Sequence, residues 1–261
     1  MNTVVCIKQV PETTSVKINK DTNTLMREGV KSIINPFDMY ALEEGLRIKE
    51  KLGGKVSAVS MGPPQAEEAL REVISYGVDD AFLLSDRAFA GADTLATSRT
   101  LAKGIKKIGD VDLIICGKQA IDGDTAQVGP GIAEKLNIPF VAFVRKIREI
   151  NSQAIKVERM MDDGYDVLEI DLPALITVVK EINEPRMPSL RGKMKAKSIN
   201  IPTWRLADLE IDEEKVGLRG SATQVIKVFS PKRDGKKEIL EGSVETQVEL
   251  LINRLNDLKV I

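Results

Sequence analysis

Short apolar runs alternate with amphipathic segments over the first 150 residues of the chain. The apolar runs are rich in β-branched residues and have the length of buried strands, which we expect at residues 3–7, 56–61, 81–84, 111–116 and 139–144. Apolar residues at helical spacing predict helices over 36–52, through 69–74, over 95–108 and from about Thr125 to Leu136. Strand and helix thus alternate every 25–30 residues or so, which predicts an α/β fold with a parallel, doubly wound sheet.

The pattern changes after Val144. The runs Ile155–Met161, Tyr165–Asp171 and Ala174–Val179 have strand character without helices between them, and Asp162-Asp163-Gly164 suits a hairpin turn. Parallel crossovers need more residues than these gaps contain. We therefore expect an antiparallel extension of the sheet.

The last third of the chain is weakly patterned. Residues 186–197 contain five basic side chains and no acidic one, and an amphipathic helix is expected over Val244–Leu258. Such a tail is too poor in apolar periodicity to form its own core. We expect a main domain over 1–182, a loop over 183–200 and an arm over 201–261 that packs on a partner chain.

The composition narrows the function classes. Of 261 residues, 43% are hydrophobic and only 4% aromatic, so the core is aliphatic. The 38 basic and 39 acidic residues nearly cancel, which argues against nucleic acid as a partner. No apolar run reaches about 18 residues, so no membrane span is expected. The N-terminus reads as a strand and not as a signal peptide, which favours a cytoplasmic protein.

The chain contains no histidine, which excludes a Ser-His-Asp triad and a histidine-ligated metal. Cys6 and Cys116 lie far apart in sequence, in apolar strand-like runs, and we expect both to be buried free thiols without a metal. Any chemistry must then come from carboxylates, lysines, backbone dipoles or a bound cofactor. Because the chain is poor in catalytic side chains but rich in nucleotide-loop features, we expect a cofactor to supply it.

The segment after the fourth strand, residues 117–127, is the strongest candidate site. It contains neither G-x-G-x-x-G nor a Walker P-loop, so an ordinary capped strand–helix turn is the alternative to nucleotide binding. Gly117 and Gly123 let the backbone approach a ligand, and Asp124 or Thr125 can cap the helix. Free amides at the helix start suit a phosphate, whereas the carboxylates of Asp122 and Asp124 suit hydroxyl groups or caps.

Two further helix starts, Asn35–Asp38 and Asp93–Thr97, would lie at the same edge of a parallel sheet. Each taken alone is explained by helix capping. Together with residues 117–127 they favour one shared binding site. In the basic run, Met187 and Leu190 stand among charges, so this run is either a solvated loop or a docking surface for a partner.

With these residues in view, the chain resembles the β (small) subunit of an electron transfer flavoprotein over essentially its whole length. Four blocks carry the resemblance: Asn35-Pro36-Phe37; Gly117 to Asp122; Val157-Glu-Arg159 through Gly164 to Leu172-Pro173-Ala174; and Asn183 to Arg186 followed by Met194 to Lys197. The third block is close to the signature pattern of that family.

The resemblance implies a Rossmann-like domain with its own adenine nucleotide site, and a C-terminal arm that embraces a larger α subunit holding FAD. In simple electron carriers of the family the β site holds structural AMP. In a second group it holds FAD, takes hydride from NADH and bifurcates the electrons between a low-potential carrier (ferredoxin or flavodoxin) and, through the α-subunit FAD, an acyl-CoA dehydrogenase. The runs 122–131 and 91–97 resemble that second group.

Carried over position by position, the resemblance places Cys6, Met61 and the 35–38 turn at the adenine end, residues 117–128 at the pyrophosphate and sugar chain, and Asp93, Thr94 and Thr97 toward the flavin. Leu190 matches the family's partner-docking anchor. The cofactor-binding set is therefore Cys6, Asn35, Pro36, Phe37, Asp38, Met61, Asp93, Thr94, Thr97, Gly117, Lys118, Gln119, Ala120, Ile121, Asp122, Gly123, Asp124, Thr125, Ala126, Gln127 and Val128.

Three hypotheses follow. The first is a redox subunit that binds FAD, and the second is a non-catalytic subunit that holds AMP as a scaffold. The third, a nucleotide-hydrolysing or adenylylating enzyme of similar fold, lacks the Ser-Gly-Gly type of phosphate loop.

Overall fold

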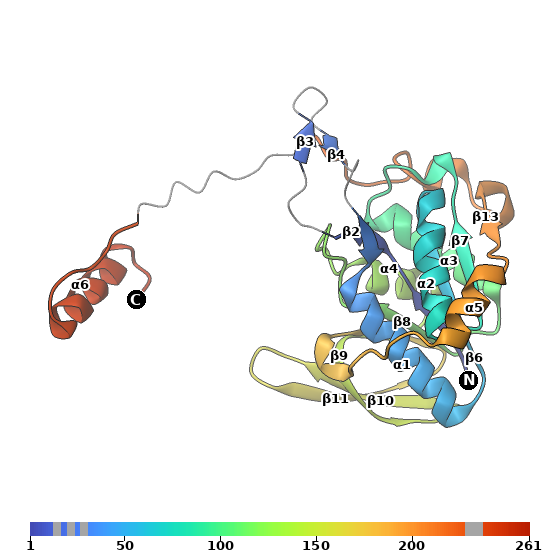
Figure 1. The fold of residues 1–261 in the computed structure, drawn as a ribbon, viewed down its shortest axis with the longest axis horizontal. Coiled ribbons are helices and arrows are strands. Elements are labelled where there is room, and N and C mark those ends of the chain that lie inside the picture. The colour runs from blue at the N-terminus through green and yellow to red at the C-terminus, as the bar shows by residue number, and fades with distance from the viewer. Residues whose placement is uncertain (13–16, 20–23, 27–30, 228–236) are drawn as a thin grey trace. The chain divides into compact units, whose positions relative to one another are not determined.

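The protein is an α/β structure built on one large, mostly parallel sheet (Figure 1). The structure, a computed structural model, describes residues 1–12, 17–19, 24–26, 31–227 and 237–261. Nine strands of these residues form the sheet in the order β11-β10-β9-β12-β8-β1-β6-β7-β13. Their bounds are β1 (Asn2–Cys6), β6 (Lys55–Met61), β7 (Asp80–Leu84), β8 (Leu113–Gly117), β9 (Phe140–Ile150), β10 (Ala154–Met160), β11 (Tyr165–Asp171), β12 (Ala174–Val178) and β13 (Thr203–Trp204).

The remaining elements are two short antiparallel strand pairs, six α-helices and five 3₁₀ helices, all among the described residues. Two short antiparallel pairs are β2 (Gln9–Pro11) with β5 (Ser32–Ile34), and β3 (Lys17–Asn19) with β4 (Thr24–Met26). The α-helices are α1 (Pro36–Leu52), α2 (Glu67–Tyr76), α3 (Thr94–Ile108), α4 (Val128–Leu136), α5 (Leu190–Ser198) and α6 (Val244–Asp257). Short 3₁₀ helices are η1 (Pro64–Ala66), η2 (Arg87–Phe89), η3 (Lys180–Ile182), η4 (Leu206–Leu209) and η5 (Glu213–Lys215).

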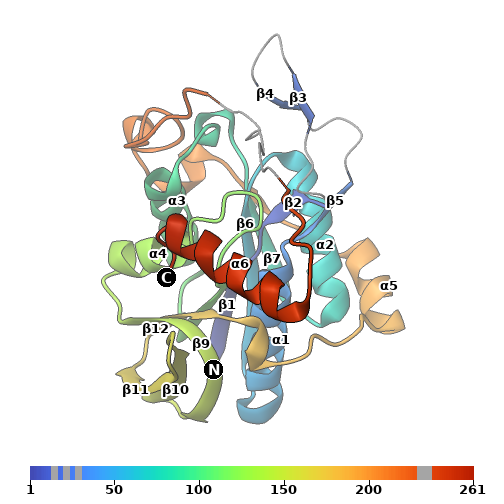
Figure 2. The ribbon, with the colours of Figure 1, turned by 90° about the vertical axis from the view of Figure 1, so that its left-hand side faces the viewer.

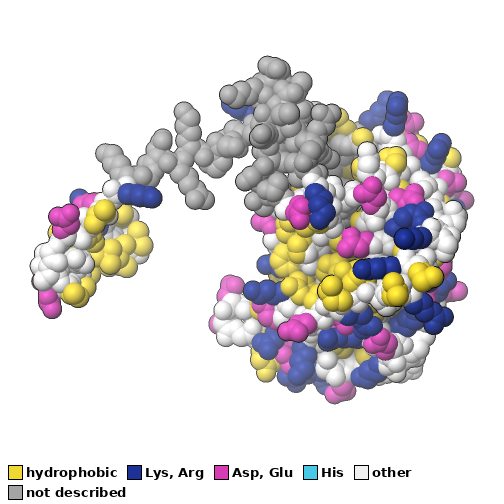
Figure 3. All heavy atoms as spheres, in the orientation of Figure 1, with side chains coloured by type: hydrophobic (Ala, Val, Ile, Leu, Met, Phe, Trp, Pro, Cys, Tyr) yellow, Lys and Arg dark blue, Asp and Glu magenta, His cyan; other side chains and the backbone are white. Residues whose placement is uncertain are grey.

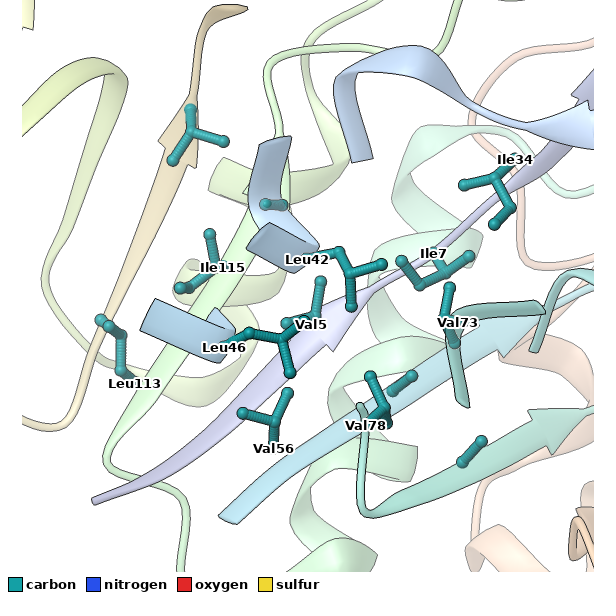
Figure 4. Packing of buried hydrophobic residues seen from close by; sticks show 14 of the residues in the cluster. Val5, Ile7, Ile34, Leu42, Leu46, Val56, Val73, Val78, Leu113 and Ile115 are labelled. Atoms are coloured by element: carbon teal, nitrogen blue, oxygen red, sulfur yellow. The ribbon is translucent and has the colours of Figure 1, made fainter. Parts of the chain in front are cut away.

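Both faces of the sheet are covered by helices, as the continuous apolar strands predict. Val5 and Ile115 belong to the cluster under α1 and α2 and pack there with Leu42 (Figure 4). Their neighbours Val4 and Ile114 belong to a second cluster under α3 and α4. Adjacent residues of a strand point to opposite faces, so each strand contributes to both layers. Figure 2 shows α1 and α2 on one side of the sheet and α3 and α4 on the other.

The order of the strands reverses between β1 and β8. From β1 the chain adds β6 and then β7 on one side, and it returns to place β8 on the other side of β1. In open parallel sheets such a switch point, at the carboxyl ends of the strands, is where ligands bind. The ends of β1 and β8 lead to Lys8 and to the candidate segment that begins at Gly117.

The antiparallel extension is confirmed for β9, β10 and β11 but not for β12. β12 lies between β8 and β9 and is parallel to both, although only two residues join it to β11. The reason is a bend in β9, where Phe143 has φ 61° and the register with β12 shifts. The first part of β9 pairs with β12 and the second part with β10, so no long crossover is needed.

The chain divides into a compact unit over Met1–Ile226 and a second unit over Lys227–Ile261. The first unit therefore extends past residue 200, where the sequence analysis places the start of the arm. β13 adds an edge strand to β7, and Leu209 and Val216 are buried with the side chains of the α3 layer. Because these residues fill the main core, residues 201–226 belong to the first unit.

The second unit contains the predicted amphipathic helix, α6. Ser243 caps it by accepting a hydrogen bond from the amide of Thr246, and Arg254 forms an ion pair with Glu238. No residue of α6 is buried, and Val248 and Leu251 are about half exposed. Figure 3 shows hydrophobic side chains on the surface of this unit. In the part of the chain that the structure describes, no helix is long and apolar enough to cross a membrane.

Candidate functional site

The candidate site begins where β8 meets the N-terminus of α1. A Cβ atom built on Gly117 would lie 2.4 Å from Oδ1 of Asp38 and 2.6 Å from the carbonyl carbon of Phe37. Only glycine allows the two backbones to come this close. The glycine that the sequence analysis assigned to ligand approach therefore serves the contact between β8 and α1.

Asn35 ties the helix start to the segment after β8. Its side chain is 1% exposed; the amide group donates to Oδ1 of Asp38 and to the carbonyl of Gln119, both at 2.9 Å, and its oxygen accepts from the amide of Ile121 at 3.1 Å. The predicted capping role is wrong, because the Asn35 side chain makes no capping bond to α1. Its polar atoms instead fix the course of residues 119–121.

Asp38 is buried beneath this contact. Burial raises the pKa of its carboxyl from 3.8 to about 7, although hydrogen bonds from Asn35 and from the amide of Lys8 act in the opposite direction. Both carboxyl oxygens are engaged, one by Asn35 and the other by the amide of Lys8 at 2.8 Å. Asp38 thus links the end of β1, through the amide of Lys8, to the end of β8, where it packs against Gly117.

The charge of Asp122 is balanced within the chain. The ammonium group of Lys8 donates to both of its oxygens, at 2.6 and 2.9 Å. Asp124 accepts a hydrogen bond from the side chain of Gln119. These contacts reduce the repulsion that free carboxylates would exert on a phosphate group, a conflict that the sequence alone leaves open.

The start of α4 has no cap. The predicted start near Thr125, capped by Asp124 or Thr125, is wrong, because the helix begins at Val128 and the side chain of Gln127 makes no capping bond. Asp124 and Ala126 have φ 53° and 54°, in the left-handed region, which turns the backbone before it can become helical. Among the described residues, none accepts a hydrogen bond from the backbone amides of Thr125–Gly129.

The first turn of α4 is packed tightly from behind. A Cβ atom on Gly129 would lie 2.6 Å from Cγ2 of Thr177 on β12, and one on Gly131 would lie 2.4 Å from Oγ of Ser98 on α3. Ser98 also donates to the carbonyls of Thr94 and Val128. The glycines of this turn therefore serve helix–sheet and helix–helix contact, which fixes the direction of the free amides.

The start of α3 is filled by the chain itself. Oδ1 of Asp93 caps the helix through the amide of Ala96 at 3.0 Å, while Oδ2 accepts from the amides of Ala222 and Thr223 at 2.8 and 2.9 Å. Burial acts to raise the pKa of Asp93, but these hydrogen bonds outweigh it and lower the pKa. Both carboxyl oxygens are thus engaged by protein groups, and Asp93 anchors the segment that follows Ser221.

The other predicted residues surround the switch point. Cys6 ends β1 and is partly exposed, and Met61 ends β6, the neighbouring strand. Lys118 lies with its ammonium group 5.5 Å from the centre of the Phe143 ring. The rest, which are exposed or partly buried and lie at the three helix starts or in the segment after β8, are Pro36, Phe37, Thr94, Thr97, Ala120 and Gly123.

The predicted docking loop contains a helix. α5 begins at Leu190, and a Cβ atom on its Gly192 would lie 2.0 Å from the carbonyl oxygen of Ser75, so α5 packs closely on the end of α2. Arg71 of α2 donates to the carbonyl of Ala196 at 2.8 Å. Leu190 is 79% exposed, which displays an apolar side chain on a helix held by the domain.

Two contributors escaped the sequence analysis. Lys8, which pairs with Asp122, has no pattern of its own; the only signal is its place just after the end of a strand at the switch point. The link between Asp93 and Thr223 joins residues 130 positions apart. Neither spacing nor composition indicates such a contact.

Comparison with known proteins decides the family. Residues 22–209 match the electron transfer flavoprotein domain. An electron transfer flavoprotein subunit beta from Thermoanaerobacterium thermosaccharolyticum is 52% identical, with all of both chains covered. The chain belongs to the electron transfer flavoprotein family.

The β-subunit relatives extend beyond that protein. The caffeyl-CoA reductase–Etf complex subunit CarD of Acetobacterium woodii is 50% identical over all of both chains. Protein FixA of Azotobacter vinelandii is 49% identical over 93% of this chain and 89% of its own. As an electron transfer flavoprotein β subunit, the chain has an α subunit as its partner.

Proposed function

We propose that this β subunit binds FAD at the switch point, accepts hydride from NADH, and bifurcates the electrons to ferredoxin or flavodoxin and, through the α-subunit FAD, to an acyl-CoA dehydrogenase. The observation that carries the cofactor site is the uncapped start of α4, with five consecutive residues whose amides have no acceptor among the described residues, Thr125–Gly129. Amides at a helix N-terminus attract phosphate.

The residues at the switch point fit a dinucleotide. The amides of Thr125–Gly129 would hold the pyrophosphate, with Gly123 beside them in open space. Cys6, Met61 and Phe37 would line the adenine end, and Thr94 and Thr97 would lie toward the flavin. Asn35, Asp38 and Asp93 would act indirectly, because protein groups already engage their side chains.

A bound flavin would supply the redox chemistry, and no side chain of this subunit need serve as an acid or base. The work of the chain would be to orient the cofactor and to set its potential through backbone dipoles. The closed ion pair of Lys8 and Asp122 adds no net charge near the phosphates. The name of the CarD relative, a subunit of a caffeyl-CoA reductase–Etf complex, supports a CoA-ester dehydrogenase as the high-potential partner.

Partner contacts would come from two helices. Leu190, exposed on α5, would dock the acyl-CoA dehydrogenase, and the half-exposed apolar side chains of α6, Val248 and Leu251, would pack on the α subunit. Both surfaces display apolar side chains that are exposed to solvent when the chain has no partner.

The nucleotide content tests the cofactor. The chain is co-expressed with its α subunit, the purified complex is denatured, and the released nucleotides are identified by chromatography and mass. The proposal predicts two FAD per heterodimer. One FAD with one AMP would make the β site structural and overturn it.

The docking surface is tested by Leu190→Ala, with Leu52→Ala as the matched control, since Leu52 is an exposed leucine at the end of α1. The Leu190 variant should slow electron delivery to the dehydrogenase at least tenfold and leave flavin content and NADH oxidation unchanged. Loss of flavin in that variant would mean that α5 has a structural role instead.

A further inference from the structure

The two cysteines, far apart in sequence, lie side by side at the switch point. β1 and β8 are parallel neighbours in which Val4 pairs with Ile114 and Val5 with Ile115, so the next pair in register is Cys6 with Cys116. Both belong to the apolar layer on the α3 and α4 side of the sheet, so their side chains share one face.

The spacing of the pair suits a covalent link. Neighbouring strands lie about 4.8 Å apart, and disulfides span Cα separations of about 4.4–6.8 Å. The backbone therefore need not move far for the sulfur atoms to bond. Two cysteines in the same register and on the same face can form a disulfide within the chain, which a single buried thiol cannot.

The two thiols differ in access. Cys6 is partly exposed, whereas Cys116 is 6% exposed. The neighbouring Cys6 thiol, together with burial, raises the pKa of the Cys116 thiol well above its ordinary value. A reagent from solvent would therefore react with Cys6 first. The thiol of Cys116 would then react with the modified sulfur of Cys6.

We propose that Cys6 and Cys116 form a redox modification site, at which a peroxide or a small-molecule disulfide oxidises the two thiols reversibly to an intramolecular disulfide. With hydrogen peroxide, the sulfur of Cys6 is oxidised to a sulfenic acid and one water leaves. The sulfur of Cys116 then displaces the hydroxyl group as a second water. Two thiols and one peroxide thus give one disulfide and two waters.

With a small disulfide such as oxidised glutathione, Cys6 first forms a mixed disulfide and releases one thiol. Cys116 then displaces the second, so two protein thiols become a disulfide while one glutathione disulfide becomes two thiols. The oxidised pair would lie next to the candidate site in sequence, because Cys116 directly precedes Gly117, the residue packed against Asp38.

The test uses the full-length chain, reduced and then treated with hydrogen peroxide or oxidised glutathione. The chain is denatured in N-ethylmaleimide and its intact mass is measured. Reduced protein should carry two maleimide groups. Oxidised protein should carry none, weigh two hydrogen atoms less than the unlabelled reduced chain, and yield a peptide pair linking Cys6 to Cys116; a reductant should restore both thiols. The readout does not depend on any bound nucleotide.

Two variants separate the roles of the cysteines. With oxidised glutathione, Cys116→Ser should retain a stable glutathione adduct on Cys6, because the second thiol is missing. Cys6→Ser should react at least tenfold more slowly, because the remaining thiol is buried. Retention of two free thiols in the oxidised wild-type chain, a disulfide between two chains, or only oxygen adducts on Cys6 would overturn the proposal.

Discussion

The helices α3 and α4 begin at the same edge of the sheet, yet their N-termini are in opposite states. Asp93 caps α3 and also holds the segment after Ser221, so protein groups engage this start. The start of α4 has no side-chain cap, and two left-handed residues, Asp124 and Ala126, lead into it. Ser98 links the two first turns.

A helix N-terminus can bind a ligand only where protein groups do not already accept hydrogen bonds from its free amides. All helix N-termini carry unpaired amides and a positive dipole end. At α3 Asp93 accepts from the amides of Ala96 and Thr97, and at α1 the side chain of Asn35 positions the segment after β8. Of the three predicted helix starts, α4 retains the most backbone amides without an acceptor among the described residues. The left-handed backbone at Asp124 and Ala126, which leads into α4, costs energy to hold.

The largest effect is expected from Asn35→Ala. The change leaves the carbonyl of Gln119 and the amide of Ile121 without their partner in a buried place. We expect the free energy of unfolding to fall by about 3 kcal/mol, and the affinity for FAD or AMP to fall at least tenfold. Chemical denaturation and calorimetric titration measure the two quantities.

The matched control is Asn183→Ala, at the end of η3, where the Asn183 side-chain amide donates to the carbonyl of Tyr40 on α1 at 3.0 Å. It should lower stability without changing nucleotide affinity. An equal loss of affinity in both variants would show that the Asn35 effect is only global destabilisation.

The next effect comes from crowding the first turn of α4. Gly129→Ala places a methyl group against Thr177, and we expect a loss of about 2 kcal/mol in unfolding free energy with weaker nucleotide binding. Gly164→Ala, in the turn between β10 and β11, is the control, because nothing lies within 4 Å of its Cβ position. If Gly164→Ala is as damaging as Gly129→Ala, packing behind α4 does not set the site.

Asp93→Ala tests the N-terminus of α3, which Asp93 caps. Loss of the cap and of the bonds to Ala222 and Thr223 should lower unfolding free energy by about 1.5 kcal/mol. Phosphate binding at the start of α4 should remain, so AMP affinity should change less than twofold. A large loss of AMP affinity would mean that α3, and not α4 alone, holds the phosphate.

Asp38 gives a pH-dependent effect. Its pKa is about 7 in the folded state and near 3.8 in the unfolded chain, so its contribution to stability is fully present below pH 4 and is lost as the pH rises toward 7. Relative to Asp38→Asn, wild-type unfolding free energy should therefore decline by about 1 kcal/mol per pH unit within that window. Parallel curves for the two proteins would contradict a protonated, buried Asp38.

The fold was largely predictable, and the site only in part. Continuous apolar strands, separated by helices that end at Gly53, Gly77 and Gly109, are enough to predict the doubly wound sheet. The parallel placement of β12 was not predictable, because it depends on the bend of β9 at Phe143. Local sequence does not encode which distant strand a bent strand will meet.

The same limit applies at the site. Asp124 and Thr125 have the chemistry of a helix cap, yet the left-handed backbone at Asp124 and Ala126 moves the helix start to Val128. The pairing of Lys8 with Asp122 spans 114 positions and joins partly exposed side chains, so no periodicity marks it. Sequence indicates which residues gather at the edge, whereas tertiary contacts decide which of them remain free.

Hydrogen exchange at the two helix starts tests the central claim most directly. The full-length chain is compared with and without saturating AMP, and then FAD, and exchange is followed for amides of Thr125–Gly129 and of Thr94–Thr97. The account predicts that either nucleotide slows exchange at Thr125–Gly129 at least tenfold, while AMP leaves Thr94–Thr97 unchanged. Protection by AMP at the start of α3, with none at the start of α4, would contradict it.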